Sequence, residues 1–261
     1  MESLDTTVII KSYNVLMETK LLYNYLLVEL KKAKVLLAQI HSDSDPENLH
    51  QYRVALRRVQ SLVSTYIKER SAFEERLKPL LKSTNILREI DVFVMGVDAV
   101  RYPLLLSDLR RYRASLYRKH WGSDIIRIQG AILEQLIDAL DTLTCSLSNT
   151  QLVKRGVERY DKALSLKKEL GRKSSAKKIH KVRISCKQAR YALEFIEASR
   201  LHRVDKQIRR CKKILRRFGD IQDTANQLEL LKEFCKTTPS DGCDALYKER
   251  KKAFKTLKKQ F

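Results

Sequence analysis

Two groups of basic residues recur in this sequence at the same spacing. Each group is a histidine followed by one basic residue three positions later and another seven positions later. The groups are His50, Arg53 and Arg57, and, 130 residues further on, His180, Arg183 and Lys187. Residues at i, i+3 and i+7 lie on one face of a helix, so each group predicts a stripe of positive charge. Two matching stripes indicate one anion-binding site built from two copies of the same element.

The residue types in the stripes suit a ligand that carries many phosphate groups. Arginine has a planar fork that gives two parallel hydrogen bonds to one phosphate, and lysine adds a point charge. Histidine donates from a ring nitrogen and gains charge near a polyanion. One isolated histidine would more often tie helices together, but duplication beside arginine favours a binding role for both. The other histidines lack such partners and are expected at surfaces or helix boundaries: His41, His120 and His202.

No catalytic motif accompanies the stripes. The sequence contains no H-E-x-x-H, no His-Asp dipeptide, no P-loop and no closely spaced glycines. A phosphate-binding site without a metal-binding carboxylate cluster or an activated nucleophile has little means of cleaving its ligand. We therefore expect no enzymatic activity, no cofactor and no bound metal.

Each stripe needs a helix that separates it from the hydrophobic core. Asp45 before Pro46 predicts the N-cap and first residue of one helix, which extends to about Lys68. The polar run 172–175 predicts the approach to the second helix. In both helices the face opposite the stripe is apolar, so we expect it to pack against the core while the basic face stays open.

Helical periodicity runs through the whole chain. Of its 261 residues 43% are hydrophobic, and only seven are glycine and four proline, which predicts an all-α fold. Besides the two stripe helices, we expect helices at about 7–40, 71–98, 103–144 with a break near Gly122, 152–170, 204–236 and 241 onward. Four helices in each half predict two four-helix bundles, residues 1–148 and 149–261, related by an internal repeat.

The net charge is +22 and is unevenly distributed. Residues 1–150 carry 21 Lys and Arg against 18 Asp and Glu, whereas residues 151–261 carry 32 against 13. Such an excess indicates a polyanionic partner, although a basic solvated surface is the simpler alternative. No apolar run approaches the roughly 18 residues of a membrane span, and the start lacks the order of a signal peptide. We expect a soluble cytoplasmic protein with no membrane partner.

The cysteine pattern does not indicate a disulfide framework. They are odd in number, scattered and without a C-x-x-C pair, so the sequence predicts free thiols and neither disulfides nor a zinc site. They are Cys145, Cys186, Cys211, Cys235 and Cys243.

Both stripes belong to longer motifs that resemble the paired signatures of CHAD domains, conserved histidine α-helical domains. The motifs are His50-x-x-Arg53-Val54-x-x-Arg57-Arg58 and His180-x-x-Arg183-Ile184-x-x-Lys187, the second followed by Ala189-Arg190-Tyr191. An acidic element follows each motif, at 88–91 and 219–223. The resemblance covers nearly the whole chain. The copies differ at the outer edge of the site, where Gln188 replaces Arg58 and Gln60 replaces Arg190.

The resemblance implies binding of inorganic polyphosphate in a basic cavity between two helical bundles, and association with cytoplasmic polyphosphate granules. The residues expected to bind phosphate are His50, Arg53, Arg57, Arg58, Lys82, His180, Arg183, Lys187, Arg190, Arg209, Lys213 and Arg216. Three carboxylates are expected either to orient these cations from behind or to be ordinary helix-end residues: Asp91, Asp220 and Asp223. The lysine-rich segment 251–259 is expected to be a solvated face that strengthens binding of polyanions at low salt.

Two other functions fit the charge. A nucleic-acid-binding helical protein would attract a phosphate backbone in the same way. Against it, only Tyr52 and Tyr191 lie near the stripes, and neither helix-turn-helix nor zinc-finger spacing occurs. The third function is a scaffold that recruits proteins to granules.

Overall fold

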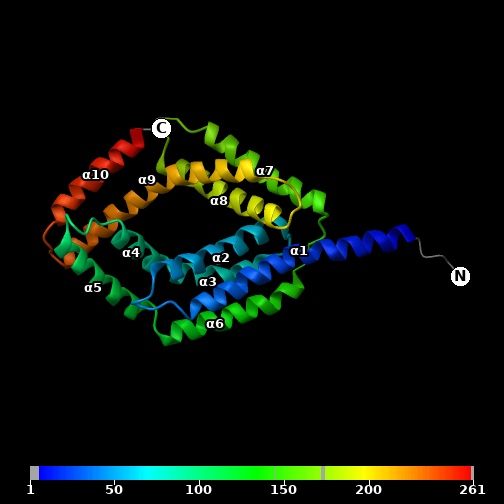
Figure 1. Cartoon of the computed structure of the whole chain (residues 1–261), viewed down its shortest axis with the longest axis horizontal. Helices are drawn as coiled ribbons and strands as arrows, with labels where there is room; N and C mark the ends of the chain where they lie inside the picture. The colour runs from blue at the N-terminus through cyan, green and yellow to red at the C-terminus, as the bar shows by residue number, and fades with distance from the viewer. Residues whose placement is uncertain (1–5, 144, 172–173, 260–261) are drawn as a thin grey trace.

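The fold is entirely helical over the residues that this computed structural model describes, 6–143, 145–171 and 174–259. Part of the polar run at 172–173 therefore lies outside the description. Within it there are ten α-helices and one short 3-10 helix (Figure 1). They are α1 (Thr6–Leu37), α2 (Pro46–Tyr66), α3 (Ser71–Ser83), α4 (Asn85–Met95), α5 (Pro103–His120), α6 (Ser123–Asp138), η1 (Ala139–Thr142), α7 (Asn149–Lys168), α8 (Ala176–Ala198), α9 (Asp205–Thr237) and α10 (Cys243–Lys259).

The stripe helices begin where side-chain caps fix them. The Asp45 carboxylate accepts from the backbone N–H of Glu47 at 2.8 Å, and Pro46 is the first residue of α2, as predicted. Ser175 caps α8 by accepting from the backbone N–H of Lys178. Local chemistry of the sequence therefore sets the start of both helices.

Two predicted helices are each divided in two, and only the second division was predicted. The helix expected at 71–98 is interrupted at Thr84, whose buried hydroxyl bonds to the Leu80 and Leu81 carbonyls and competes with the helical ladder. The helix expected at 103–144 has the break predicted near Gly122: α5 ends at His120 and α6 begins at Ser123. Between them, the ring nitrogen of Trp121 donates to the carbonyl of Ile40. As a result, six α-helices rather than four precede residue 143 among those described.

The stripe helices lie together in the interior of the arrangement. Helix α2 packs on α1 and α3, α8 packs on α7 and α9, and α2 and α8 pack on each other. Helix α4 also contacts α9 and α2 contacts α7, so elements from both predicted bundles meet at several places (Figure 1). This arrangement places the basic faces of α2 and α8 on either side of one region.

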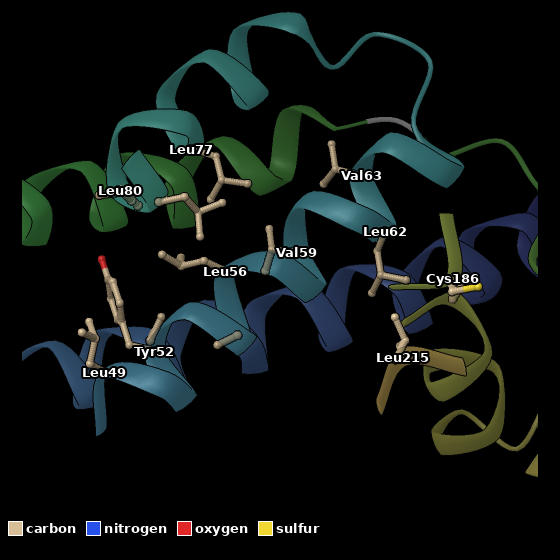
Figure 2. Close-up of a cluster of buried hydrophobic side chains, with 14 of the residues drawn as sticks. Leu49, Tyr52, Leu56, Val59, Leu62, Val63, Leu77, Leu80, Cys186 and Leu215 are labelled. Carbon is tan, nitrogen blue, oxygen red and sulfur yellow. The ribbon is translucent and has the colours of Figure 1, made fainter. Parts of the chain in front are cut away.

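One hydrophobic core runs through both predicted bundles. Leu62 of α2, Cys186 of α8 and Leu215 of α9 belong to the same buried cluster and lie close together in Figure 2. At the other end of α2, Leu49 and Tyr52 are fully buried. The apolar faces of the stripe helices thus pack into the core, as the sequence predicts.

The prediction of free thiols is wrong for two cysteines. Cys235 at the end of α9 and Cys243 at the start of α10 form a disulfide. The short connection between these helices includes Gly242 at φ +91°, a backbone conformation that glycine adopts readily, and it brings the two Cα atoms within 6.2 Å. The other three thiols are free and buried, as expected. Over the described part of the chain, no helix is sufficiently long and apolar to cross a membrane.

Asp91 joins α4 to α5 instead of facing the stripes. Its side chain is completely buried, and its carboxylate accepts from Arg113 Nε at 2.6 Å and from the Tyr117 hydroxyl at 2.8 Å. The carboxylate therefore orients a structural arginine and not a residue of either stripe.

The first prediction concerns this contact. Asp91→Ala leaves the Arg113 guanidinium buried without its counter-ion, so we expect a loss of about 3–5 kcal/mol in the free energy of unfolding. Urea denaturation followed by circular dichroism measures the loss. The matched control is Asp220→Ala, an exposed carboxylate whose removal should change stability by less than about 0.5 kcal/mol. Equal stability of the two variants would contradict the structural role of Asp91.

Candidate functional site

Four helices enclose a cleft of about 570 Å³ between the stripe helices. Helices α2 and α8 provide the motif residues, and α4 and α9 complete the walls. Its lining residues are His50, Arg53, Val54, Arg57, Asn85, Arg88, Glu89, Val92, His180, Arg183, Lys187, Arg190, Tyr191, Gln222, Asp223, Asn226 and Gln227. Among these described residues, six guanidinium or ammonium groups face only two carboxylates. The cleft therefore carries a strong excess of positive charge.

Arg53 is held in place by the interruption between α3 and α4. Its guanidinium donates to the Leu81 carbonyl and to Asn85 Oδ1, both at 2.8 Å, and to the Thr84 hydroxyl. Burial, with repulsion from Arg57 and Arg88, lowers the pKa of Arg53 to about 10. Arg53 thus shapes the wall of the cleft as well as contributing charge to it.

Lys187 and Arg183 have no hydrogen-bond or ion-pair partner within the described ranges. Burial lowers the pKa of Lys187 to about 8, and repulsion from Arg183, Arg57 and Arg190 adds to the shift. Asp223 acts in the opposite direction but is too weak to reverse it. These cations repel one another across the cleft, and an anion bound among them would relieve that repulsion.

The two motif histidines lie at the cleft in different environments. His50 is half-buried, and burial together with Arg88, Lys187 and Arg190 lowers its pKa below the ordinary value. His180 is exposed at the lining. At neutral pH His50 is consequently neutral, and its ring carries one N–H donor.

Asp223 is the one predicted carboxylate that lines the cleft. Burial raises its pKa, while Arg183 and Lys187 act to lower it. Arg190 also lies at the cleft, with its guanidinium 4.7 Å from the centre of the Tyr191 ring and its Nε 3.4 Å from Glu194. Asp223 and Arg190 therefore both lie at the cleft.

Several other predicted residues lie outside the cleft lining. Arg58 is bound between Glu29 of α1 at 2.9 Å and Glu194 of α8 at 3.4 Å, so its charge is used within the fold. Arg209 pairs with Asp205, and the remaining side chains are exposed elsewhere on α3 and α9. Those exposed residues are Lys82, Lys213, Arg216 and Asp220.

Arg88 is the main residue of the lining that the predicted site did not include. It lies on α4, and its Nη1 is 3.5 Å from the Pro46 carbonyl at the start of α2. The available signal was the i, i+3, i+7 spacing of Asn85, Arg88 and Val92, which repeats the spacing of the stripes. The predicted site included Lys82 of the same expected helix, but the interruption at Thr84 separates the two residues and Lys82 lies outside the lining.

The described side chains form no cluster of three or more His, Cys, Asp or Glu residues that would hold a metal ion. The cleft lining is dominated by donors and cations, which are groups that bind anions and not metals.

Comparison with known proteins identifies the family. The family model for the CHAD domain matches residues 25–232, most of the chain, so the chain belongs to the CHAD domain family. The structure is similar to the crystal structure of the CHAD domain from the plant Ricinus communis, with a TM-score of 0.64 and 19% identity over 92% of this chain and 85% of that one. It is also similar to PptA from Streptomyces chartreusis, with a TM-score of 0.60 and 12% identity over 92% and 98%. No curated protein matches the sequence significantly.

The second prediction follows from the depressed pKa of Lys187. The ordinary pKa of lysine is above 10, so folding disfavours the charged form, and this cost is present in full below pH 8. We expect Lys187→Met to raise the free energy of unfolding at pH 7 by on the order of 1–2 kcal/mol. The advantage over the wild type should shrink between pH 8 and about 10.5, because the lysine then becomes neutral in both states.

Urea denaturation at pH 7 and pH 10 tests this, with the exposed Lys252→Met as the control. A Lys187→Met variant that is less stable than the wild type at pH 7 would show that the buried charge of Lys187 does not destabilise the fold.

Proposed function

We propose that the cleft between α2 and α8 binds inorganic polyphosphate without cleaving it, and that the protein associates with cytoplasmic polyphosphate granules. The observation that carries the proposal is the convergence of six cations on one cleft that has two carboxylates. A chain of phosphates offers one negative charge per unit and no other recognition feature. Cations and N–H donors are sufficient to hold such a chain.

The distribution of internal partners supports a role in binding for particular residues. Arg183 and Lys187 form no hydrogen bond or ion pair among the described residues, and the nearby Asp223 offsets their charge only in part. Within the same part of the chain, the Arg57 guanidinium donates to the neutral amide of Gln60 at 2.8 Å and forms no ion pair. Their charges are therefore available to a ligand. We propose that two motif helices with the same spacing address the polymer from opposite sides, as expected of an internal repeat.

The lining gives little support to catalysis. Neither His50 nor His180 makes a hydrogen bond to a carboxylate of the described chain, and such a bond would orient and activate a general base. The free thiols are buried away from the lining. We therefore propose that the protein holds polyphosphate and does not turn it over.

Binding of nucleic acid is less well supported than binding of polyphosphate. Proteins that bind single strands stack bases on exposed aromatic rings. Tyr52 is fully buried, and Tyr191 is buried beneath Arg190. Neither ring offers an open face to a base.

The third prediction locates the affinity. Arg57→Gln, Arg183→Gln and Lys187→Gln together remove three charges from the cleft, and Lys252→Gln, Lys255→Gln and Lys259→Gln remove three from the exposed face of α10. We expect the cleft variant to lose at least about 100-fold in affinity for long-chain polyphosphate at about 0.15 M salt, allowing for non-additivity. The α10 variant should lose no more than about 10-fold, because exposed charges are screened.

Isothermal titration calorimetry measures both affinities, and circular dichroism checks that helicity is unchanged. The same samples incubated with Mg²⁺ should release no orthophosphate above background. Equal losses in the two variants would mean that net charge alone binds the polymer, and preference for single-stranded RNA of equal charge would favour nucleic acid as the ligand.

A further inference from the structure

A second cationic pocket lies outside the cleft, where α2 meets α7. It has a volume of about 370 Å³ and is lined by Thr65, Arg155, Glu158, Arg159 and Lys162. Three of these side chains are cations and one is a carboxylate. The predicted site included none of them.

The pocket is linked to the cleft through one residue of α8. Arg159 donates to Gln188 Oε1 and to the Ser64 carbonyl, both at 2.9 Å, and the Ser61 hydroxyl donates to the Gln188 carbonyl. Gln188 directly follows Lys187, which lines the cleft. Arg159 of the pocket thus contacts α8 at the residue that follows Lys187 of the cleft.

The corresponding place on the other side of the molecule is closed by aromatic residues. The 130-residue offset between the motifs relates Arg155 to Tyr25 and Thr65 to Phe195. The Tyr25 and Phe195 rings pack edge to face with their centres 5.4 Å apart. On the α7 side, a threonine and a charged arginine occupy these two positions. The apolar contact that fills the space on the α1 side is therefore missing on the α7 side.

The same offset shows that, at one further pair of equivalent positions, the arginine is paired with a carboxylate on the α1 side only. It relates Arg58 to Gln188 and Glu29 to Arg159. On the α1 side, Arg58 and Glu29 form an ion pair at 2.9 Å. On the α7 side, the equivalent contact joins an arginine to a neutral glutamine, so a full positive charge is left without a counter-ion in the contact.

Other groups around the pocket do not supply that counter-ion. Arg155 and Lys162 have no ion-pair partner in the described part of the chain, although the exposed Glu158 is on the lining. Burial, together with Arg70, lowers the pKa of Arg159. An anion in this pocket would relieve the repulsion, as in the cleft.

We propose that this pocket binds the part of a polyphosphate chain that leaves the cleft, so that the polymer path extends on the α7 side and not on the α1 side. The inference rests on the proposed function of the cleft. A long chain then contacts both places at once, whereas a chain of three phosphates occupies the more strongly charged cleft. The pocket contributes to affinity only when the ligand is long enough to reach it.

The test compares two double variants, each of which loses two positive charges. Arg155→Gln with Lys162→Gln removes two charges from the pocket but retains Arg159, which supports α2 and α8. Lys31→Gln with Lys32→Gln removes two charges from the exposed surface of α1, where Lys32 is the position equivalent to Lys162. Each variant is titrated with long-chain polyphosphate and with tripolyphosphate at about 0.15 M salt.

We expect the pocket variant to lose about 10-fold or more in affinity for the long chain and to bind tripolyphosphate within about twofold of the wild type. The α1 variant should stay within about twofold for both ligands. Thr65→Phe with Arg155→Tyr, which rebuilds the aromatic pair of the other side, should reproduce the selective loss. Equal losses in the pocket and α1 variants would overturn the inference, and so would an equal loss of tripolyphosphate in the pocket variant.

Failure of the proposed function gives a different result. In that case the triple cleft variant binds long chains as tightly as the wild type does. If the cleft variant loses affinity and the pocket variant does not, the function stands and the extension of the path is wrong.

Discussion

The structure depends on a hydrophobic core that holds two helices together against the mutual repulsion of their basic side chains. Lys187 and Arg183 of α8 and Arg57 of α2 face a shared cleft without ionic partners among the described residues, and the pKa of Lys187 falls to about 8 as a result of burial and this repulsion. The opposite faces of the same helices pack into one core, where Leu62 meets Cys186 and Leu215. Hydrophobic burial thus holds together a site that electrostatics alone would push apart.

The fold uses two other partly buried arginines differently. Arg58 is bound between Glu29 and Glu194, and Arg113 is bound to Asp91. Arg53 lies between these two cases. Its N–H groups donate to uncharged acceptors at the α3–α4 interruption, and its positive charge remains at the cleft. A large net positive charge therefore does not identify binding residues. We propose that the binding residues are the arginines and lysines of the cleft that form no ion pair in the described part of the chain.

The sequence was sufficient to predict the all-α fold, the cap at Asp45 and the pairing of two basic helix faces, because these follow from local periodicity and capping chemistry. It could not predict partners that come from distant helices, such as Glu29 for Arg58. The interruption at Thr84 depends on a buried hydroxyl, and the disulfide at Cys235 depends on the path of a connecting loop. The 130-residue offset also places Arg155 at the position equivalent to Tyr25. This difference can be interpreted only once the contacts around each position are known.

Proton uptake on binding tests the central claim most directly. Titrating the protein with polyphosphate at pH 9, in two buffers of different ionisation enthalpy, measures the number of protons taken up by the complex. Because Lys187 is mostly neutral in the free cleft at that pH and an adjacent polyanion favours its charged form, the account predicts uptake of about one proton per site. The uptake at pH 9 should disappear in Lys187→Met. Tight binding at pH 9 with no proton uptake would show that the polymer binds away from the cleft, in contradiction of the account.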